Sequence, residues 1–156
     1  MYLYLRKEDY TSKSIFRNKD MENLYPKELE GFEKDILNRN FVSRSIKCDY
    51  QIGYWRKANA IHKWFVDICA QGEDNCLPIY VSKAELKALR ELVEEVLTHK
   101  DKANSLLPTE EGFFFGTTEY DNWYFQDLEY TKQLLDKVIP FLEEHQEYEV
   151  IYQASW

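Results

Sequence analysis

The chain is 156 residues long, which is typical of one globular domain, and we expect residues 1–156 to form a single domain. Hydrophobic residues make up 44% of the chain and charged residues 31%, a composition too apolar for an intrinsically disordered protein. The net charge of -8 argues against binding to duplex DNA, where affinity depends on neutralising phosphates. The charge is also uneven, because residues 41–70 carry 5 basic and 2 acidic side chains and residues 107–156 carry 2 and 11.

The cysteines and the N-terminal sequence indicate the compartment. Cys48, Cys69 and Cys76 form no CxxC pair, which argues against a disulfide framework or a zinc ribbon and favours a reducing environment. The first residues, MYLYLRKEDY, lack the apolar core of a signal peptide, and no stretch is long and apolar enough to span a membrane. We therefore expect a cytoplasmic protein that binds no membrane and needs no cofactor.

The first predicted elements alternate between strand and helix. A strand is predicted at MYLYLRK, where tyrosine and leucine alternate, and a helix is predicted to begin at Pro26. The segment 41–52 predicts a strand or an extended connector. A helix over 54–70, ended by Gly72, follows from apolar residues at helical spacing. These residues are Tyr54, Ala58, Ile61, Phe65 and Ile68.

The next helix has a clear start signal. Ser82 and Glu85 have the spacing of a capping box, and the helix they begin should end near His99. Its buried stripe is predicted to be Leu86, Leu89, Val93 and Val96. The stretch 100–118 has no helical period and contains proline and glycine, which predicts a long loop.

The last helix is predicted to be capped by Thr118 and to be kinked or ended by Pro140. Its apolar stripe is Tyr124, Leu128, Thr131, Leu135, Val138 and Leu142. A strand over 148–153 follows, and we expect it to pair with the N-terminal strand because a lone strand needs a hydrogen-bonding neighbour. The predicted fold is a helix-rich α+β domain, with three or four helices around an aromatic core and a small sheet made from the two chain ends.

The segment YWRKANAIHKWF carries the first half of a candidate ligand site. On a helix its aromatic, basic and amide side chains flank the apolar stripe, so that they form the border of a pocket for an anionic ring-bearing ligand such as a nucleotide. The candidate residues are Trp55, Arg56, Asn59, His62 and Lys63. The alternative is that the tryptophan and histidine fill the core edge while the cations pair with carboxylates of the last helix.

The second half of the candidate site lies between residues 106 and 127. Three consecutive phenylalanines between two glycines are followed by several carboxylates, and we take Phe114, Asp121 and Trp123 as candidate ligand-binding residues. Glu119 and Asp121 could also act as general bases or bind a hard cation. The alternative is that these carboxylates cap the helix or form ion pairs.

No motif identifies a reaction. The three histidines lack metal-ligand spacing, so no metal site is predicted, and the sequence contains no GxGxxG, Walker, GxSxG or kinase motif. The absence of such motifs lowers the expectation of an enzyme without excluding one.

Two segments, YWRKANAIHKWFV and LLPTEEGFFFGTTEYDNWYFQDL, carry a resemblance over about residues 50–140. The chain resembles small uncharacterised proteins encoded by bacteriophages and bacterial prophages. The resemblance implies a phage or bacterial cytoplasm as the setting, and it assigns no activity, ligand or functional residue.

Three hypotheses for the function follow. The first is a non-catalytic phage-type accessory protein that binds a protein partner or a second copy through aromatic and acidic surfaces. The second is a binder of a small anionic, nucleotide-like ligand, in which Arg56 and His62 border the largest pocket, Trp55 or Trp64 forms its wall and the Gly112–Gly116 loop its mouth. The third is a hydrolase or transferase that uses His62 and Asp121 as an acid/base pair. A concave pocket joining the two segments would favour the second hypothesis, and a flat apolar patch the first.

Overall fold

The computed structural model describes most of the chain, namely residues 1–11, 44–112 and 116–155. It divides the chain into two compact units, Met1–Arg6 with Asp49–Trp156, and Lys7–Cys48. In the smaller unit, Lys47 Nζ lies 3.3 Å from Glu8 Oε2. The helix expected from Pro26 lies outside the described residues, and the single-domain expectation stays a prediction.

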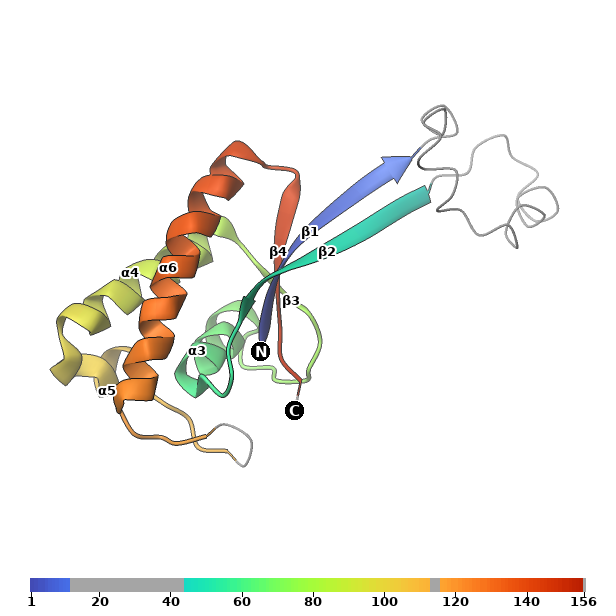
Figure 1. Ribbon diagram of the computed structural model, residues 1–156. Coiled ribbons are helices and arrows are strands. Elements are labelled where there is room, and N and C mark those ends of the chain that lie inside the picture. The colour runs from blue at the N-terminus through green and yellow to red at the C-terminus, as the bar shows by residue number, and fades with distance from the viewer. Residues whose placement is uncertain (12–43, 113–115, 156) are drawn as a thin grey trace. The chain divides into compact units, whose positions relative to one another are not determined.

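A four-stranded sheet brings the two ends of the chain together. Its strands are β1 (Tyr2–Thr11), β2 (Arg44–Tyr54), β3 (Ile79–Val81) and β4 (Tyr148–Gln153). They are hydrogen-bonded in the order β2-β1-β4-β3, and β3 runs antiparallel to β4 with Tyr80 opposite Ile151. The N-terminal and C-terminal strands are therefore neighbours, as their alternating patterns predict (Figure 1).

Helices α4 (Lys83–Thr98) and α6 (Asn122–Glu144) pack against each other. Every residue of the two predicted stripes is buried. The capping box of α4 is confirmed, since the Glu85 N–H donates to Ser82 Oγ and the Ser82 N–H donates to Glu85 Oε2. Two short helices, η3 (Lys100–Lys102) and α5 (Ala103–Leu106), occupy the start of the predicted loop. With these helices and the sheet, the predicted α+β fold class is confirmed.

Helix α6 begins later than predicted and runs through Pro140. Its N-cap is Asp121 rather than Thr118, because Asp121 Oδ1 accepts from the N–H groups of Trp123 and Tyr124. Pro140 does not end the helix, which continues to Glu144, and a kink at this proline stays a prediction. Its buried positions lie on both sides of the proline, so that core packing along the whole helix outweighs the one backbone hydrogen bond that proline cannot make.

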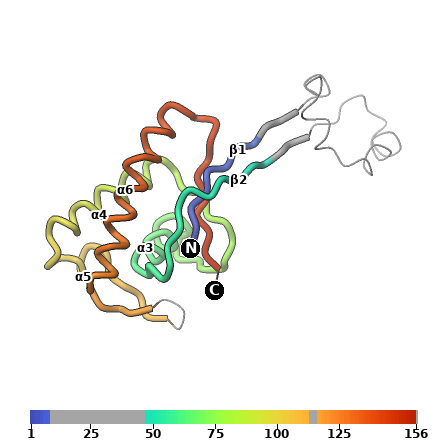
Figure 2. The backbone as a smooth tube through the Cα atoms, in the orientation of Figure 1, coloured from blue at the N-terminus to red at the C-terminus, as the bar shows by residue number. Residues whose placement is uncertain are grey.

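The predicted helix over 54–70 is shorter than expected. Strand β2 continues to Tyr54, α3 spans Asn59–Trp64, and a π-helical turn, η2 (Phe65–Cys69), completes the segment before Gly72. The physical reason is long-range pairing: the Trp55 N–H donates to the Met1 carbonyl at 2.9 Å, and the Met1 ammonium donates to the Trp55 carbonyl at 3.2 Å. Figure 2 traces the chain from β2 through residues 55–58 into α3.

The core is aromatic, as the composition predicts. The Phe65 ring stacks on Tyr152 with centroids 4.1 Å apart, and Trp55 lies 6.2 Å from Phe65 and 6.4 Å from Tyr152. The buried indole nitrogen of Trp55 is satisfied by Thr131 Oγ1 of α6 at 2.8 Å. This bond joins the residue after β2 to the middle of α6. It thereby fixes the position of the turn between β2 and α3.

Charge pairing also differs from the prediction. The carboxylates of α6 pair mainly with cations of α4: Arg90 Nε lies 2.8 Å from Asp136 Oδ1, and Lys87 Nζ lies 2.7 Å from Glu143 Oε1. The main helical partner of α6 is therefore α4. A direct packing of the segment 54–70 on α6, which the opposite charges of the two segments predict, stays a prediction. Arg56 and Lys57, which directly follow β2, therefore form no ion pair with the described carboxylates of α6.

Candidate functional site

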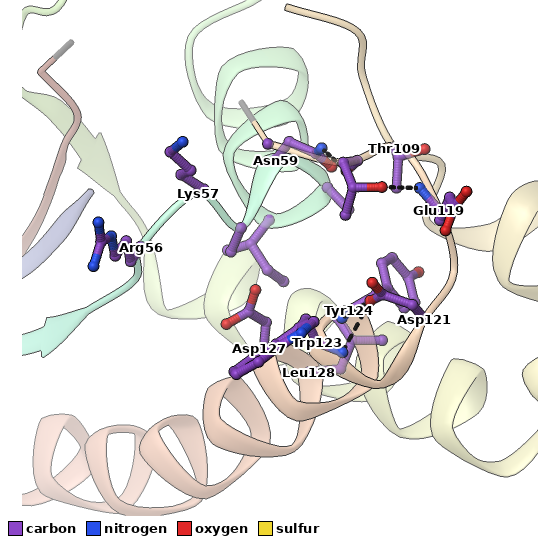
Figure 3. Close-up of a pocket in the computed structure, with 15 residues that line it drawn as sticks. Arg56, Lys57, Asn59, Thr109, Glu119, Asp121, Trp123, Tyr124, Asp127 and Leu128 are labelled. Atoms are coloured by element: carbon purple, nitrogen blue, oxygen red, sulfur yellow. Dashed lines mark hydrogen bonds between the residues drawn. The ribbon is translucent and has the colours of Figure 1, made fainter. Parts of the chain in front are cut away.

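A pocket of about 220 Å³ lies where the turn after β2, α3, the loop after α5 and the first turns of α6 meet (Figure 3). Its floor consists of buried apolar residues, among them Ile61 and Leu128, and its rim consists of exposed charged and aromatic residues such as Arg56, Lys57 and Trp123. It is lined by Arg56, Lys57, Ala58, Asn59, Ala60, Ile61, Thr109, Gly116, Thr117, Glu119, Asp121, Trp123, Tyr124, Asp127 and Leu128. The pocket joins the two segments that the sequence singled out.

The loop wall of the pocket is held by hydrogen bonds from side chains to backbone. Asn59 Nδ2 donates to the Thr117 carbonyl at 2.8 Å, and Thr109 Oγ1 donates to the Thr118 carbonyl at 2.9 Å. On the α6 side, the Tyr124 hydroxyl donates to the Leu107 carbonyl at 2.8 Å. These three bonds hold the described part of the wall in place without a ligand.

Gly116 allows the loop to approach the turn closely. Its φ is +83°, and a Cβ atom at this position would lie 3.3 Å from Lys57 Cβ and 3.6 Å from the Lys57 carbonyl oxygen. A side chain here would be strained by the backbone conformation and crowded by Lys57. Glycine therefore keeps the loop against the cationic side of the pocket.

The cationic rim consists of Arg56 and Lys57, both exposed. They lie in a tight turn in which Lys57 has φ +64° and its carbonyl accepts from the Asn59 N–H at 2.9 Å. Within the described part of the chain, neither side chain forms an ion pair. Two adjacent cations at the mouth of a pocket can hold a phosphate or carboxylate by charge-assisted hydrogen bonds.

The opposite side of the pocket is acidic and belongs to α6. Asp121 Oδ1 caps the helix, whereas the half-buried Asp127 carboxyl makes no hydrogen bond or ion pair with the residues the structure describes. Burial and the nearby Asp121 raise the pKa of Asp127 to about 6. Trp123, on the same helical turn, is 72% exposed. This side therefore offers a hydrogen-bond acceptor beside a flat aromatic ring.

The structure brings together half of the predicted site residues. Arg56, Asn59, Asp121 and Trp123 line the pocket, and Phe114 lies outside the described residues. Asn59 is 4% exposed and its amide nitrogen is used by the loop, so that its visible role is to hold the wall.

Trp55, His62 and Lys63 do not line the pocket. Trp55 is in the core, and Lys63 Nζ lies 3.0 Å from Asp67 Oδ2 and 3.7 Å from Glu110 Oε1. The physical reason is that α3 begins only at Asn59, whereas Trp55 and Arg56 lie in the turn after β2. Trp55 and Arg56 therefore do not share one helical face with His62 and Lys63.

His62 lies in the core and away from the pocket lining. It is 1% exposed, with Nδ1 2.7 Å from the Tyr152 hydroxyl and Nε2 3.3 Å from Asp74 Oδ2. Burial lowers the pKa of His62, and Asp74 opposes this change. Asp121 lines the pocket and caps α6, so the structure gives no support to the proposed acid/base pair of His62 and Asp121.

Two charged residues that line the pocket, Lys57 and Asp127, are not among the predicted ligand-binding residues. The predicted helix over 54–70 includes Lys57, but the position of Lys57 on the rim follows from a left-handed turn that periodicity does not reveal. Asp127 could have been found, because it lies four residues after Trp123 and therefore on the same face of α6.

A wider and more open depression, of about 590 Å³, lies elsewhere on the larger unit, so the prediction that Arg56 and His62 border the largest pocket is wrong. The depression is lined by Tyr80, Val81, Ser82, Lys83, Glu85, Leu142, Gln146, Tyr148, Glu149 and Val150. The glutamate and serine of the α4 capping box already bond each other, so the beginning of α4 offers less to a ligand there.

Among the residues that the structure describes, no group of three histidine, cysteine or acidic side chains is arranged to hold a metal ion. Nor does any described helix have both the length and the apolar character needed to cross a membrane. Comparisons of the chain with models of protein families, with curated proteins and with solved structures gave no match.

Proposed function

We propose that this protein binds a small ligand carrying a ring and an anionic group, of the nucleotide type, in the pocket between the turn after β2 and the start of α6. One observation carries the proposal: two adjacent cations, Arg56 and Lys57, border an apolar-floored pocket and form no ion pair with the described residues. A flat exposed ring, Trp123, lies on another part of the same rim. The setting we propose is a phage-infected or bacterial cytoplasm.

The electrostatics of the pocket support an anionic group at one end of the ligand. The carboxylates of α6 that form ion pairs do so with cations of α4 or with Lys132 of α6 itself, as described for Asp136 and Glu143. The cations on the pocket rim are therefore not neutralised by this helix. An incoming phosphate would gain charge-assisted hydrogen bonds there without displacing a protein carboxylate.

Calorimetric titration with AMP, GMP, CMP and UMP tests the proposal, with inorganic phosphate as the probe for the anion alone. We expect at least one nucleotide to bind and Arg56→Ala to weaken it roughly ten- to a hundred-fold, since a charge-assisted hydrogen bond contributes about 1.5–3 kcal/mol. Lys57→Asn should act in the same direction, because asparagine tolerates the left-handed backbone at this position.

Lys137→Ala is the matched control, because Lys137 is an exposed cation of α6 outside the pocket. It should leave the affinity unchanged. If no nucleotide binds the wild-type protein, or if the control weakens binding as much as Arg56→Ala does, the proposed function is wrong.

A second candidate function is binding of a protein partner, and one observation favours it. Tyrosine rings gather on the β1–β2 part of the sheet, where the Tyr2 ring lies 6.1 Å from Tyr4 and 5.3 Å from Tyr54. Tyr50 and Tyr54 of β2 are 52% and 48% exposed. Tyrosine commonly anchors protein interfaces, so an accessory protein of phage type could use this surface for a host protein or a second copy.

Native mass spectrometry of the protein purified from its own cells separates the two functions. A retained mass of a few hundred daltons supports the ligand-binding function. A retained second copy or heterologous chain, lost in Tyr54→Ser, supports the partner-binding function instead.

A further inference from the structure

Asp127 is a polar residue of the pocket whose side chain would gain hydrogen bonds from a ligand. Its carboxyl is half-buried and makes no hydrogen bond or ion pair among the described residues, although its backbone carbonyl accepts from Thr131 Oγ1 at 2.6 Å. Burial and Asp121 raise its pKa to about 6, so that most molecules still carry a carboxylate at neutral pH. A half-buried carboxylate without donors is costly, and N–H donors from a ligand would remove that cost.

Asp127 and Trp123 form one recognition surface. They are four residues apart on α6, so their side chains lie on the same face of the helix. Figure 3 shows the Asp127 carboxyl directed into the pocket, with Trp123 on the same stretch of helix. A planar ring that stacks on the indole can therefore direct one of its edges toward the carboxylate.

The charges of the pocket limit how the ligand is built. Neither Arg56 nor Lys57 lies within ion-pair distance of Asp127, and burial and Asp121, rather than a neighbouring cation, account for the pKa of Asp127. Because the cations follow β2 and Asp127 belongs to α6, a ligand that contacts both elements must carry its anion and its donors on different groups. An α-amino acid holds its ammonium and carboxylate on one carbon, whereas a nucleotide separates base and phosphate by a sugar.

We propose that the ligand is a guanine nucleotide: the N1–H and 2-amino groups of the base donate to the two oxygens of Asp127, the ring stacks on Trp123, and the phosphate binds Arg56 and Lys57. This inference rests on the proposed function and adds the identity of the base. An ionised carboxylate only accepts hydrogen bonds, and guanine is the common base with two adjacent N–H donors on one edge. Adenine and cytosine each place a ring nitrogen that accepts hydrogen bonds beside their amino group, and this acceptor would repel the second oxygen of the carboxylate.

The first test compares GMP, IMP and AMP on the wild-type protein at pH 7.5 by calorimetry. IMP keeps N1–H and lacks the 2-amino group, so we expect it to bind about ten-fold more weakly than GMP. AMP should be weaker than IMP. Equal affinities for the three nucleotides would overturn the guanine assignment and leave the proposed function standing, whereas no binding by any nucleotide would overturn both.

The second test changes the preferred base from guanine to xanthine by one substitution. In Asp127→Asn one acceptor oxygen becomes an N–H₂ donor, which matches the 2-oxo group of xanthine beside its N1–H. We expect GMP to lose at least ten-fold in affinity and XMP to become the preferred ligand. Glu129→Gln removes an equal charge from an exposed position of α6 outside the pocket and should keep the preference for GMP.

A loss of fold would weaken all nucleotides together and lower the thermal midpoint. An inverted ratio of GMP to XMP affinity is a result that a purely structural role of Asp127 would not produce. An unchanged ratio in Asp127→Asn, with GMP still dependent on Arg56, would overturn the contact between Asp127 and the base.

Discussion

At the scale of single residues, the pocket contains side chains that already form hydrogen bonds and side chains that form none with the residues the structure describes. Asn59 uses its amide to hold the Thr117 carbonyl, and Asp121 uses its carboxylate to cap α6. Arg56 and Asp127 make no such bonds with the described residues. The side chains that already form hydrogen bonds hold the walls of the pocket, and the other side chains can form hydrogen bonds with a ligand.

Asp127 should leave a signature in the pH dependence of stability. Its pKa in the folded protein is about 6, above the ordinary value of 3.8, so the folded state holds this proton more tightly than the unfolded state does. The resulting stabilisation is fully present below about pH 3.8 and is lost as the pH rises through about 6. Relative to Asp127→Asn, the wild-type protein should therefore become less stable between pH 4 and pH 7.

Urea denaturation of both proteins across this pH range measures the difference in the free energy of unfolding. Subtraction removes the contribution of the other titrating groups, including His62, whose lowered pKa acts in the opposite direction. A difference that is flat with pH, or that grows in favour of the wild-type protein, would show that Asp127 is not buried as the structure has it.

At the scale of elements, local signals account for α4 and α6. Ser82 and Glu85 satisfy each other's backbone donors, and the apolar stripes of the two helices become the buried faces. These signals lie within a few residues or repeat along one helix, so they survive in any tertiary context. The start of α3 has no such signal, because Ala58 offers no side-chain cap.

The segment of α3 and η2 should depend on its aromatic packing rather than on its charges. Phe65 is fully buried against Tyr152 and Trp55, so Phe65→Ala should cost about 3–5 kcal/mol. Lys63 pairs with Asp67 and Glu110 at the surface, and Lys63→Ala should cost less than about 1 kcal/mol. Chemical denaturation of both variants gives the comparison, and equal costs would contradict the packing.

At the scale of the whole molecule, β4 is the element on which the sheet depends. It lies between β1 and β3, and Val150, Ile151 and Tyr152 are buried. Removal of residues 150–156 takes away these side chains and separates β1 from β3. The loss exceeds about 6 kcal/mol at about 2 kcal/mol or more for each side chain, which is comparable to the total stability of a domain.

We therefore expect the truncated chain to be unfolded at 25 °C, or to lose its near-ultraviolet aromatic circular dichroism on heating in one cooperative step at a lower temperature than the full chain. The signal is suited to the purpose because Tyr152 belongs to the aromatic cluster with Phe65 and Trp55. A thermal midpoint equal to that of the full chain would show that the pairing of the terminal strands does not hold the domain together.

The sequence by itself determined the elements whose causes are local. The capping box at Ser82, the stripes of α4 and α6 and the strand over 148–153 follow from neighbouring residues or from a repeating period, and the structure confirms each of them. The sequence also brought Arg56 and Trp123 into one candidate site, because basic and aromatic residues mark a ligand edge whatever the exact backbone.

Only the tertiary structure decided where the strand ends and the helix begins, and thus which side chains share the pocket. The hydrogen bonds between Met1 and Trp55 keep residues 54–55 with the sheet, and the bond from Asn59 to Thr117 brings the loop to the turn. Each of these bonds joins residues more than 50 positions apart, and such pairing depends on the whole folded chain. For this reason periodicity placed His62 at the pocket, whereas the fold buried it in the core and put Asp127 there instead.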